Sequence, residues 1–219
     1  MTPDYQKAAI KAIEILERFN ISTAPVDPLR ILKQIPGVLV FSFQEVSENI
    51  NVDRKEILNT LGCKNQDAVT TAFVDGDSLQ YVVTYNRILP SVIVDRAIAR
   101  ELGHVVLGHD GTRPEDVRNI EAKVFAHHLL CPRPLIRSID EAGIRLTEVL
   151  FSSITGLDSN CLPCIRNQPP VFVPAEMNRR IKEQFLPYIM NLTEYNKFAS
   201  QKDRSALVDL GNYMEGYEE

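Results

Sequence analysis

The chain has 219 residues, of which 44% are hydrophobic and 24% are charged. These fractions are typical of a globular protein and exclude a disordered or low-complexity chain. The formal net charge of −5 provides no general basic surface, so we do not expect nucleic acid as a direct ligand.

The N-terminal residues are polar and lead into an amphipathic pattern, which differs from the apolar block of a secretory signal peptide. No apolar run is long enough to span a bilayer. We therefore expect a cytoplasmic protein with no membrane partner. Its cysteines are then expected to be reduced thiols. They are Cys63, Cys131, Cys161 and Cys164.

The first part of the chain mixes helical and β-type patterns of apolar residues. Asp27 followed by Pro28 is typical of a helix N-terminus, and the turn around Gly76 between two β-rich runs predicts a hairpin. The predicted elements are helices over residues 3–20 and from residue 27, a strand over 38–41, small helices over 45–61, and strands over 68–74 and 79–85.

The rest of the chain is predicted to be mainly helical. Because the strands come in a block before most of the helices and do not alternate with them, the pattern favours an α+β fold over a parallel α/β sheet. The predicted elements are helices over residues 93–108, 114–130, 135–139, 147–155 and 175–190, with an extended proline-rich linker over 169–174. The acidic residues 215–219 are predicted to fray.

The helix over residues 93–108 contains Arg100-Glu101-Leu102-Gly103-His104, which differs by one residue from the zinc-protease motif His-Glu-x-x-His. In that motif two histidines one helical turn apart bind Zn²⁺, and the glutamate is the general base for the bound water. Glu101 is therefore the candidate base and His104 a candidate metal ligand. Arg100 occupies the position of the other histidine. Glu121, on the following helix, is the candidate third ligand.

Two linked segments resemble the ImmA/IrrE family of zincin-type metallo-endopeptidases. They read Glu-Leu-Gly-His-Val-Val-Leu-Gly-His over residues 101–109 and Glu-Ala-x-x-Phe-Ala-x-x-Leu-Leu-x-Pro over residues 121–132. The resemblance covers roughly residues 1–135. It implies a zincin-like α+β domain over 1–135, with a small, mainly antiparallel sheet and a hairpin packed on the motif helix. Residues 136–219 are then expected to form a helical C-terminal extension packed on that domain.

The resemblance also implies a zinc site with ligands at position 100, His104 and Glu121, and with Glu101 as the base. Members of the family often belong to mobile-element or stress regulons, and they cleave or otherwise inactivate helix-turn-helix transcriptional repressors. This sequence departs from the family pattern at Arg100. The departure affects metal binding and proteolysis, but not the expected fold.

The arginine at position 100 cannot replace a histidine as a ligand, because a guanidinium has no lone pair to offer a metal. It can still supply a positive charge. We therefore predict that Arg100 reaches Glu121 in a bidentate pair, which would hold the two helices together and replace zinc electrostatically.

A rebuilt metal site is the alternative, with His104, Glu121 and one further histidine as ligands. His109 would point away from the site on a continuous helix, but a helix that ends at Gly108 would let the chain swing back. His128 shares a helical face with Glu121, about 10 Å further along at the standard helical rise. Both histidines remain possible substitute ligands at this stage.

His104 and the close cysteine pair also have non-catalytic interpretations. On an apolar helix, His104 alone would more often be a core histidine, and only its partnership with Glu101 and Glu121 favours a functional site. Cys161-Leu162-Pro163-Cys164 is predicted to be an ordinary pair of thiols, since no second Cys-x-x-Cys accompanies it.

Three functions are consistent with the sequence. The favoured one is a catalytically impaired pseudoenzyme that binds a protein partner, such as a helix-turn-helix repressor, through the cleft that an active relative would use. The second is an active zinc endopeptidase with a rebuilt metal site that cleaves a repressor. The third is a regulatory module that senses redox state or metal through Cys161 and Cys164.

Overall fold

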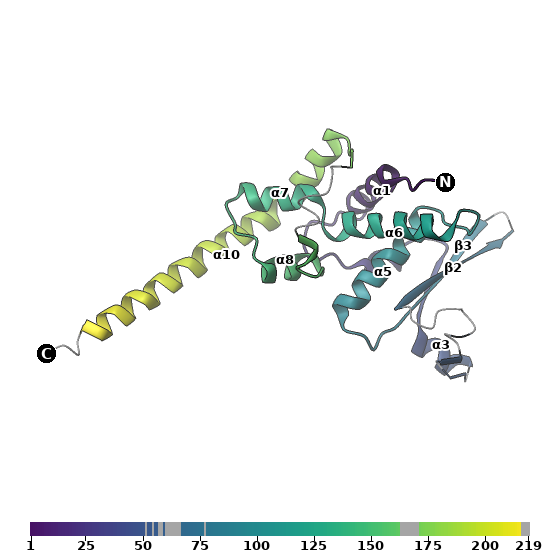
Figure 1. Cartoon of the computed structure of the whole chain (residues 1–219), viewed down its shortest axis with the longest axis horizontal. Helices are drawn as coiled ribbons and strands as arrows, with labels where there is room; N and C mark the ends of the chain where they lie inside the picture. Colours follow the sequence, from purple (N-terminus) through teal and green to yellow (C-terminus); the bar gives the residue numbers. More distant parts are fainter. Residues whose placement is uncertain are drawn as a thin grey trace.

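A computed structural model shows an α+β protein in which helices surround a small sheet (Figure 1). The structure describes residues 1–50, 52–53, 55–56, 59, 67–76, 78–162 and 171–215, with side chains up to residue 196. Cys63, Cys164 and the acidic residues 216–219 lie outside the described residues, as do residues 169–170 of the predicted linker. The α+β class predicted from the order of the elements is confirmed.

The described elements follow the predicted order, and most of their ends lie within about two residues of the predicted ones. The strands are β1 (Val38–Ser42), β2 (Ala68–Asp75) and β3 (Ser78–Tyr85). The helices are α1 (Tyr5–Arg18), α2 (Pro28–Leu32), α3 (Phe43–Ile50), α5 (Ser91–Val106), α6 (Glu115–Leu130), α7 (Arg133–Glu141), α8 (Glu148–Thr155) and α10 (Ala175–Glu215).

Local side-chain caps explain where several helices begin. The Asp27 carboxylate accepts a hydrogen bond from the Arg30 N–H at 2.9 Å, directly before the proline that starts α2. The Asp4 carboxylate does the same for α1, where it accepts from the Lys7 N–H at 2.9 Å. The helix start predicted at Asp27 is therefore confirmed.

The sheet has the strand order β1-β3-β2 among the described strands. The β2–β3 pair is an antiparallel hairpin in which Ala68 lies opposite Tyr85, so the predicted hairpin is confirmed. The β1 strand instead runs parallel to β3, with Val38 opposite Tyr81. The sheet is thus mixed, because β1 connects to the hairpin through a crossover that includes α3 and not through a tight turn.

The sheet and the helices pack together around α5. Both strands of the hairpin contact α5, as expected for a hairpin packed on the motif helix, and α6 contacts both α5 and α1. Figure 1 shows α5 and α6 crossing beside the sheet, with α1 next to α6. Val83, Ile98, Leu102 and Phe125 are fully buried where these elements meet.

The contact between α5 and α6 is unusually close at Gly103. A Cβ atom on this residue would lie 3.0 Å from the Ala122 carbonyl oxygen and 3.1 Å from both the Ala122 Cα and the Phe125 Cδ1. The two helix backbones can approach this far only because residue 103 has no side chain. His104 follows Gly103 on α5 and Glu121 precedes Ala122 on α6, so the close contact also brings these two residues together.

The last helix is longer than the sequence predicts. The buried side chains of Ile181, Phe185 and Ile189 anchor the first part of α10, which contacts α7 and α1. The predicted helix ends at residue 190, where the regular apolar spacing fades, but α10 continues to Glu215 and projects away from the body (Figure 1). No glycine or proline interrupts the sequence between residues 188 and 210, so nothing local stops the helix.

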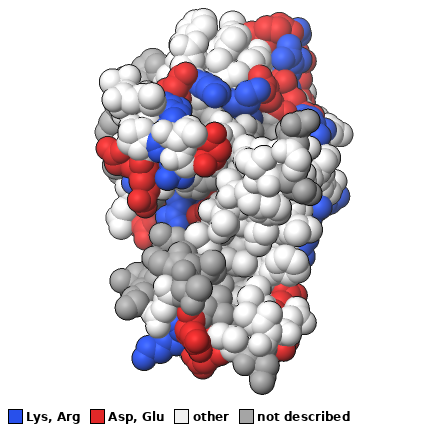
Figure 2. Space-filling view, turned by 90° about the vertical axis from the view of Figure 1, so that its right-hand side faces the viewer, with Lys and Arg blue, Asp and Glu red and all other residues white. Residues whose placement is uncertain are grey.

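At the end of the molecule that carries the hairpin turn, the described residues mix acidic and basic side chains (Figure 2). Figure 2 shows Lys and Arg interspersed with Asp and Glu, with broad uncharged areas between them. The hairpin contributes exposed apolar side chains, and Phe73 and Val74 of β2 are 41% and 73% exposed. Among the described residues, no helix combines the length and the apolarity needed to cross a membrane.

The close helix contact predicts that Gly103→Ala destabilises the protein, although alanine favours a helix by about 1 kcal/mol over glycine. The added methyl group meets backbone and aromatic atoms, and such overlap typically costs about 1–3 kcal/mol. Urea unfolding should show a lower midpoint for this variant. Lys123→Ala, at an exposed position of α6, is the control and should leave the midpoint nearly unchanged. A raised midpoint for Gly103→Ala would contradict the close contact.

Candidate functional site

The end of α5 positions the first part of the site. Gly108 follows the helix with a φ of +70°, in the left-handed region that favours glycine. The Gly108 N–H donates to the Val105 carbonyl at 3.1 Å, and the His109 N–H donates to the His104 carbonyl at 3.0 Å. This is a Schellman motif, in which the second residue beyond the cap lies against the last turn of the helix. The backbone therefore directs His109 back toward His104.

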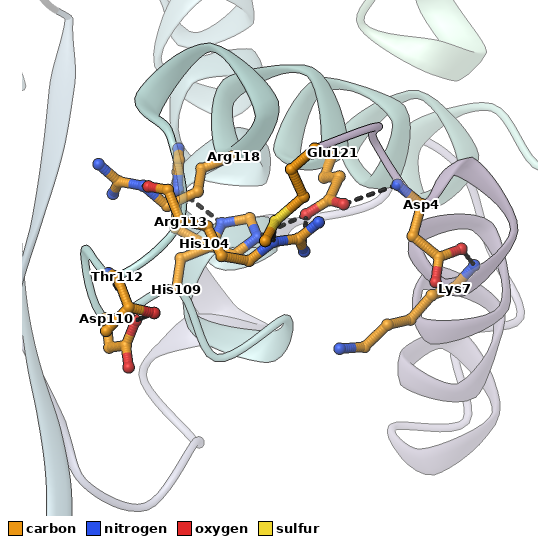
Figure 3. Close-up of polar contacts among 10 residues, drawn as sticks. Asp4, Lys7, His104, His109, Asp110, Thr112, Arg113, Arg118 and Glu121 are labelled. Carbon is orange, nitrogen blue, oxygen red and sulfur yellow. Dashed lines mark hydrogen bonds and ion pairs between the residues drawn. The ribbon is translucent and has the colours of Figure 1, made fainter.

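His104, His109 and Glu121 form a buried chain of polar contacts (Figure 3). The Nδ1 atoms of the two histidines lie 2.9 Å apart, and the Nε2 of His109 lies 3.1 Å from an oxygen of Glu121. The three residues are 8%, 4% and 2% exposed, in the order of the chain. His109 thus lies between His104 and Glu121 and connects them. We refer to these three residues as the His–His–Glu chain.

Two further groups bind Glu121. The Arg113 Nη1 donates to the same carboxylate oxygen as His109 at 2.7 Å, and the backbone N–H of Asp4 donates to the other oxygen at 2.7 Å. Arg113 belongs to the loop between α5 and α6, where the Arg118 Nε donates to its carbonyl at 3.0 Å. The N-terminal segment, the loop and α6 therefore converge on one buried carboxylate (Figure 3).

The surroundings of Glu121 keep it ionised. Burial raises its pKa, but the hydrogen bonds from Asp4 and His109 and the charge of Arg113 outweigh burial, so the pKa lies below its ordinary value. Glu121 is therefore an ionised carboxylate, and the Arg113 guanidinium is its counterion.

Burial dominates at the two histidines. Burial, with smaller contributions from His109, Arg100 and Arg118, lowers the pKa of His104 to about 3. Burial also lowers the pKa of His109, and Glu121 offsets this only in part. Both rings are therefore neutral near pH 7. His109 then donates from Nε2 to the carboxylate and accepts at Nδ1 from His104.

Glu101 forms a separate ion pair. The Arg100 Nε and Nη2 both lie 3.1 Å from one of its carboxylate oxygens, and the Thr70 hydroxyl of β2 donates to the other at 2.8 Å. Glu101 is 3% exposed, and burial raises its pKa, partly offset by Arg100 and Thr70. Among the described residues, no hydrogen bond or ion pair joins this pair to the His–His–Glu chain.

The predicted ion pair between Arg100 and Glu121 is wrong. Arg100 binds the adjacent Glu101, and Arg113 binds Glu121. Arg113 lies in the loop that joins the two helices, and its guanidinium contacts the buried Glu121 carboxylate. The Arg100 side chain is 40% exposed and does not contact Glu121. The predicted role, a cation of the chain that neutralises Glu121, is thus filled by a different arginine.

Of the two candidate substitute ligands, His109 lies in the site and His128 lies elsewhere. The helix ends before Gly108 and the chain swings back, so His109 joins His104 and Glu121. His128 instead lines a cavity beside α7. Sequence reasoning missed Arg113, Asp4 and Thr70. Gly108 was the one local signal for the returning loop.

The donor atoms are of the types that bind zinc, but their arrangement does not suit the metal. A tetrahedral site needs each ligand to direct a lone pair at one common point. Here His109 directs one ring nitrogen at His104 and the other at Glu121, and Arg113 occupies the carboxylate. Across the part of the chain that the structure describes, no group of three or more His, Cys, Asp or Glu is placed to hold a metal ion.

The cysteines with described side chains are free thiols. Burial raises the pKa of Cys131 to about 12, with a smaller contribution from Cys161. A thiol with this pKa is not a reactive nucleophile near neutral pH. Cys161 is partly buried against the core, and its sequence partner Cys164 lies outside the described residues, so the redox hypothesis stays a prediction.

No protein-family model matches this chain, and no curated protein matches it. The resemblance to the ImmA/IrrE family therefore rests on the two segments around Glu101 and Glu121. We infer function from the geometry of the site.

The two arginines are expected to differ in their contribution to stability. Arg113→Gln removes a cation from Glu121, whose low pKa keeps it charged at pH 7, so we expect a loss of about 1–3 kcal/mol. Arg100→Gln should cost less, because the raised pKa of Glu101 makes protonation easier. Urea unfolding of both variants at pH 7 tests this order. Equal losses, or a larger loss for Arg100→Gln, would show that Arg113 is not the main counterion.

Proposed function

We propose that this chain is an ImmA/IrrE-like, zincin-like protein with impaired peptidase activity, and that it binds a protein partner such as a helix-turn-helix transcriptional repressor. One observation carries the proposal. Glu121, at the third-ligand position, is already held by Arg113, His109 and the Asp4 N–H.

The charge balance at Glu121 opposes a metal. A zinc ion bound there would have to displace the Arg113 guanidinium from a contact of 2.7 Å and separate His109 from the carboxylate. The displaced guanidinium would then lie near a doubly charged cation without its partner, and breaking a buried ion pair in this way is costly. Arg113 and His109 thus take the place that a metal would need.

The candidate base, Glu101, is also engaged by neighbouring side chains. A general base must accept a proton from water, and burial raises the pKa of Glu101, which Arg100 and Thr70 offset only in part. Both carboxylate oxygens are already engaged, however, one by Arg100 and the other by Thr70. The arrangement supports a stable fold more than water activation.

The sheet offers a surface for a partner next to the site. Among the described strands β2 lies at an edge of the sheet, and its Thr70 contacts Glu101. An extended peptide can add to such an edge through backbone hydrogen bonds, with exposed apolar side chains such as Phe73 and Val74 adding contacts. Binding of this kind does not require hydrolysis, because substrate binding and transition-state stabilisation are separable.

A second candidate function is an active zinc endopeptidase with ligands from His104, His109 and Glu121. The observation that favours it is the contact between these three side chains, at 2.9 and 3.1 Å. It requires a different arrangement, in which His109 turns one nitrogen away and Arg113 leaves Glu121.

The metal content of the protein separates the two candidates. Purified without chelator, the natural chain should contain far less than one equivalent of zinc by elemental analysis. The double variant Arg100→His, Arg113→Gln restores a second imidazole and frees the carboxylate, so it should bind close to one equivalent. Adding His104→Ala to the double variant should remove the metal. Near-stoichiometric zinc in the natural chain, lost on His104→Ala, would contradict the proposal and support the active enzyme.

Partner binding is tested with any helix-turn-helix repressor that a reading frame next to this gene encodes. We expect the two proteins to co-elute in size-exclusion chromatography, with the repressor intact by mass spectrometry. Glu101→Gln should leave the complex unchanged, since binding does not use the base. Phe73→Ser with Val74→Ser should weaken the complex, whereas Val149→Ser, at an 81% exposed apolar position on α8, should not. Chelator-sensitive cleavage that Glu101→Gln abolishes would contradict the proposal.

A further inference from the structure

A cavity of about 480 Å³ lies beside α7 and the start of α10, formed by residues other than those of the His–His–Glu chain. Its lining combines residues of α1, α6, α7 and α10 with residues 171–173, which precede α10. This volume lies within the range of about 300–1,000 Å³ found for small-molecule pockets. Nothing in the proposed function uses this cavity.

The charged side chains that line the cavity are mostly positive. They are Arg133, Arg137, Arg179 and Lys182, with Glu141 as the acidic residue. Arg179 pairs with Glu176 and Glu183, which line up along α10, and Lys182 pairs with Glu141. Arg137 is exposed and forms no hydrogen bond or ion pair with any other described residue. The cavity therefore contains at least one cation that is available to a ligand.

Arg133 and Arg137 lie one helical turn apart on α7, so their side chains share a helical face. Like charges at this spacing repel each other, and an anion between them would relieve the repulsion. Burial and the charge of Arg137 lower the pKa of Arg133. Burial, followed by the charge of Arg133, lowers the pKa of His128 to about 4. His128 is then neutral near pH 7 and can donate one hydrogen bond.

Apart from the polar residue Asn178, the rest of the lining is apolar. Phe172 is 68% exposed at the cavity, so its ring is accessible to a ligand, and Pro134 and Ile13 are other apolar lining residues. A ligand that fits both parts carries a planar or tetrahedral anionic group on an apolar body. Guanidinium groups bind phosphate and carboxylate through paired N–H donors.

We propose that this cavity binds a small organic anion, with its phosphate or carboxylate group at Arg133 and Arg137 and its apolar body against Phe172. The proposal does not depend on the proposed function, because the cavity shares no residue with the His–His–Glu chain or the Arg100–Glu101 pair. A failed repressor experiment would leave it standing.

Isothermal titration calorimetry with phenyl phosphate, benzoate and inorganic phosphate tests the proposal. Phenyl phosphate or benzoate should bind saturably, and whichever binds more tightly identifies the anionic group. Arg137→Gln should weaken binding about tenfold, as expected for loss of a charge-assisted hydrogen bond. Arg145→Gln is the matched control, since it removes the same charge from an exposed arginine outside the cavity and should leave the affinity unchanged.

Phe172→Ala tests the apolar part separately. It should reduce the affinity for phenyl phosphate to that for inorganic phosphate, because only the organic anion uses the aromatic side chain. The proposal is overturned if neither organic anion binds saturably at millimolar concentration. It is also overturned if Arg137→Gln and Arg145→Gln bind the tighter probe equally, since binding would then reflect general charge. Circular dichroism confirms that the variants are folded.

Discussion

The contact of α5 with α6 at Gly103 and Ala122 is the constraint on which the site depends. With no side chain at residue 103, the helix backbones touch, and the neighbouring residues His104 and Glu121 come together inside the protein. The short loop between α5 and α6 then passes close to His104 and Glu121. It places His109 and Arg113 beside Glu121, where a connection to a more distant helix would not.

A buried carboxylate must be compensated wherever it occurs, because an ionised group in a dry interior is otherwise very costly. Among the described residues, the two buried carboxylates are each compensated by an arginine of the chain, Glu101 by Arg100 and Glu121 by Arg113. Each carboxylate is therefore neutralised by a cation of the chain, from α5 itself for Glu101 and from the loop between α5 and α6 for Glu121. This is the physical basis for separating a zincin-like architecture from zinc-dependent hydrolysis in our proposal.

The incorrect prediction that Arg100 pairs with Glu121 shows what a sequence motif can and cannot predict. The linked motif pointed to Glu121, which Arg113 neutralises in the structure, and the helical spacing placed His104 on the same helix as Glu101. It selected Arg100 as the cation because that residue replaces a motif histidine. Position in a motif does not decide which of several arginines reaches a buried group, since loop path and side-chain reach decide it. Arg113 had no motif position and was therefore missed.

The sequence alone determined the order of the elements, the cap at Asp27, the hairpin and the residue types of the site, because these depend on backbone preferences over a few neighbouring residues. Only the tertiary structure decided that β1 pairs in parallel with β3 and that the Asp4 N–H binds Glu121 across 117 positions of the chain. Such contacts depend on how whole helices pack, and local spacing carries no information about partners so far apart.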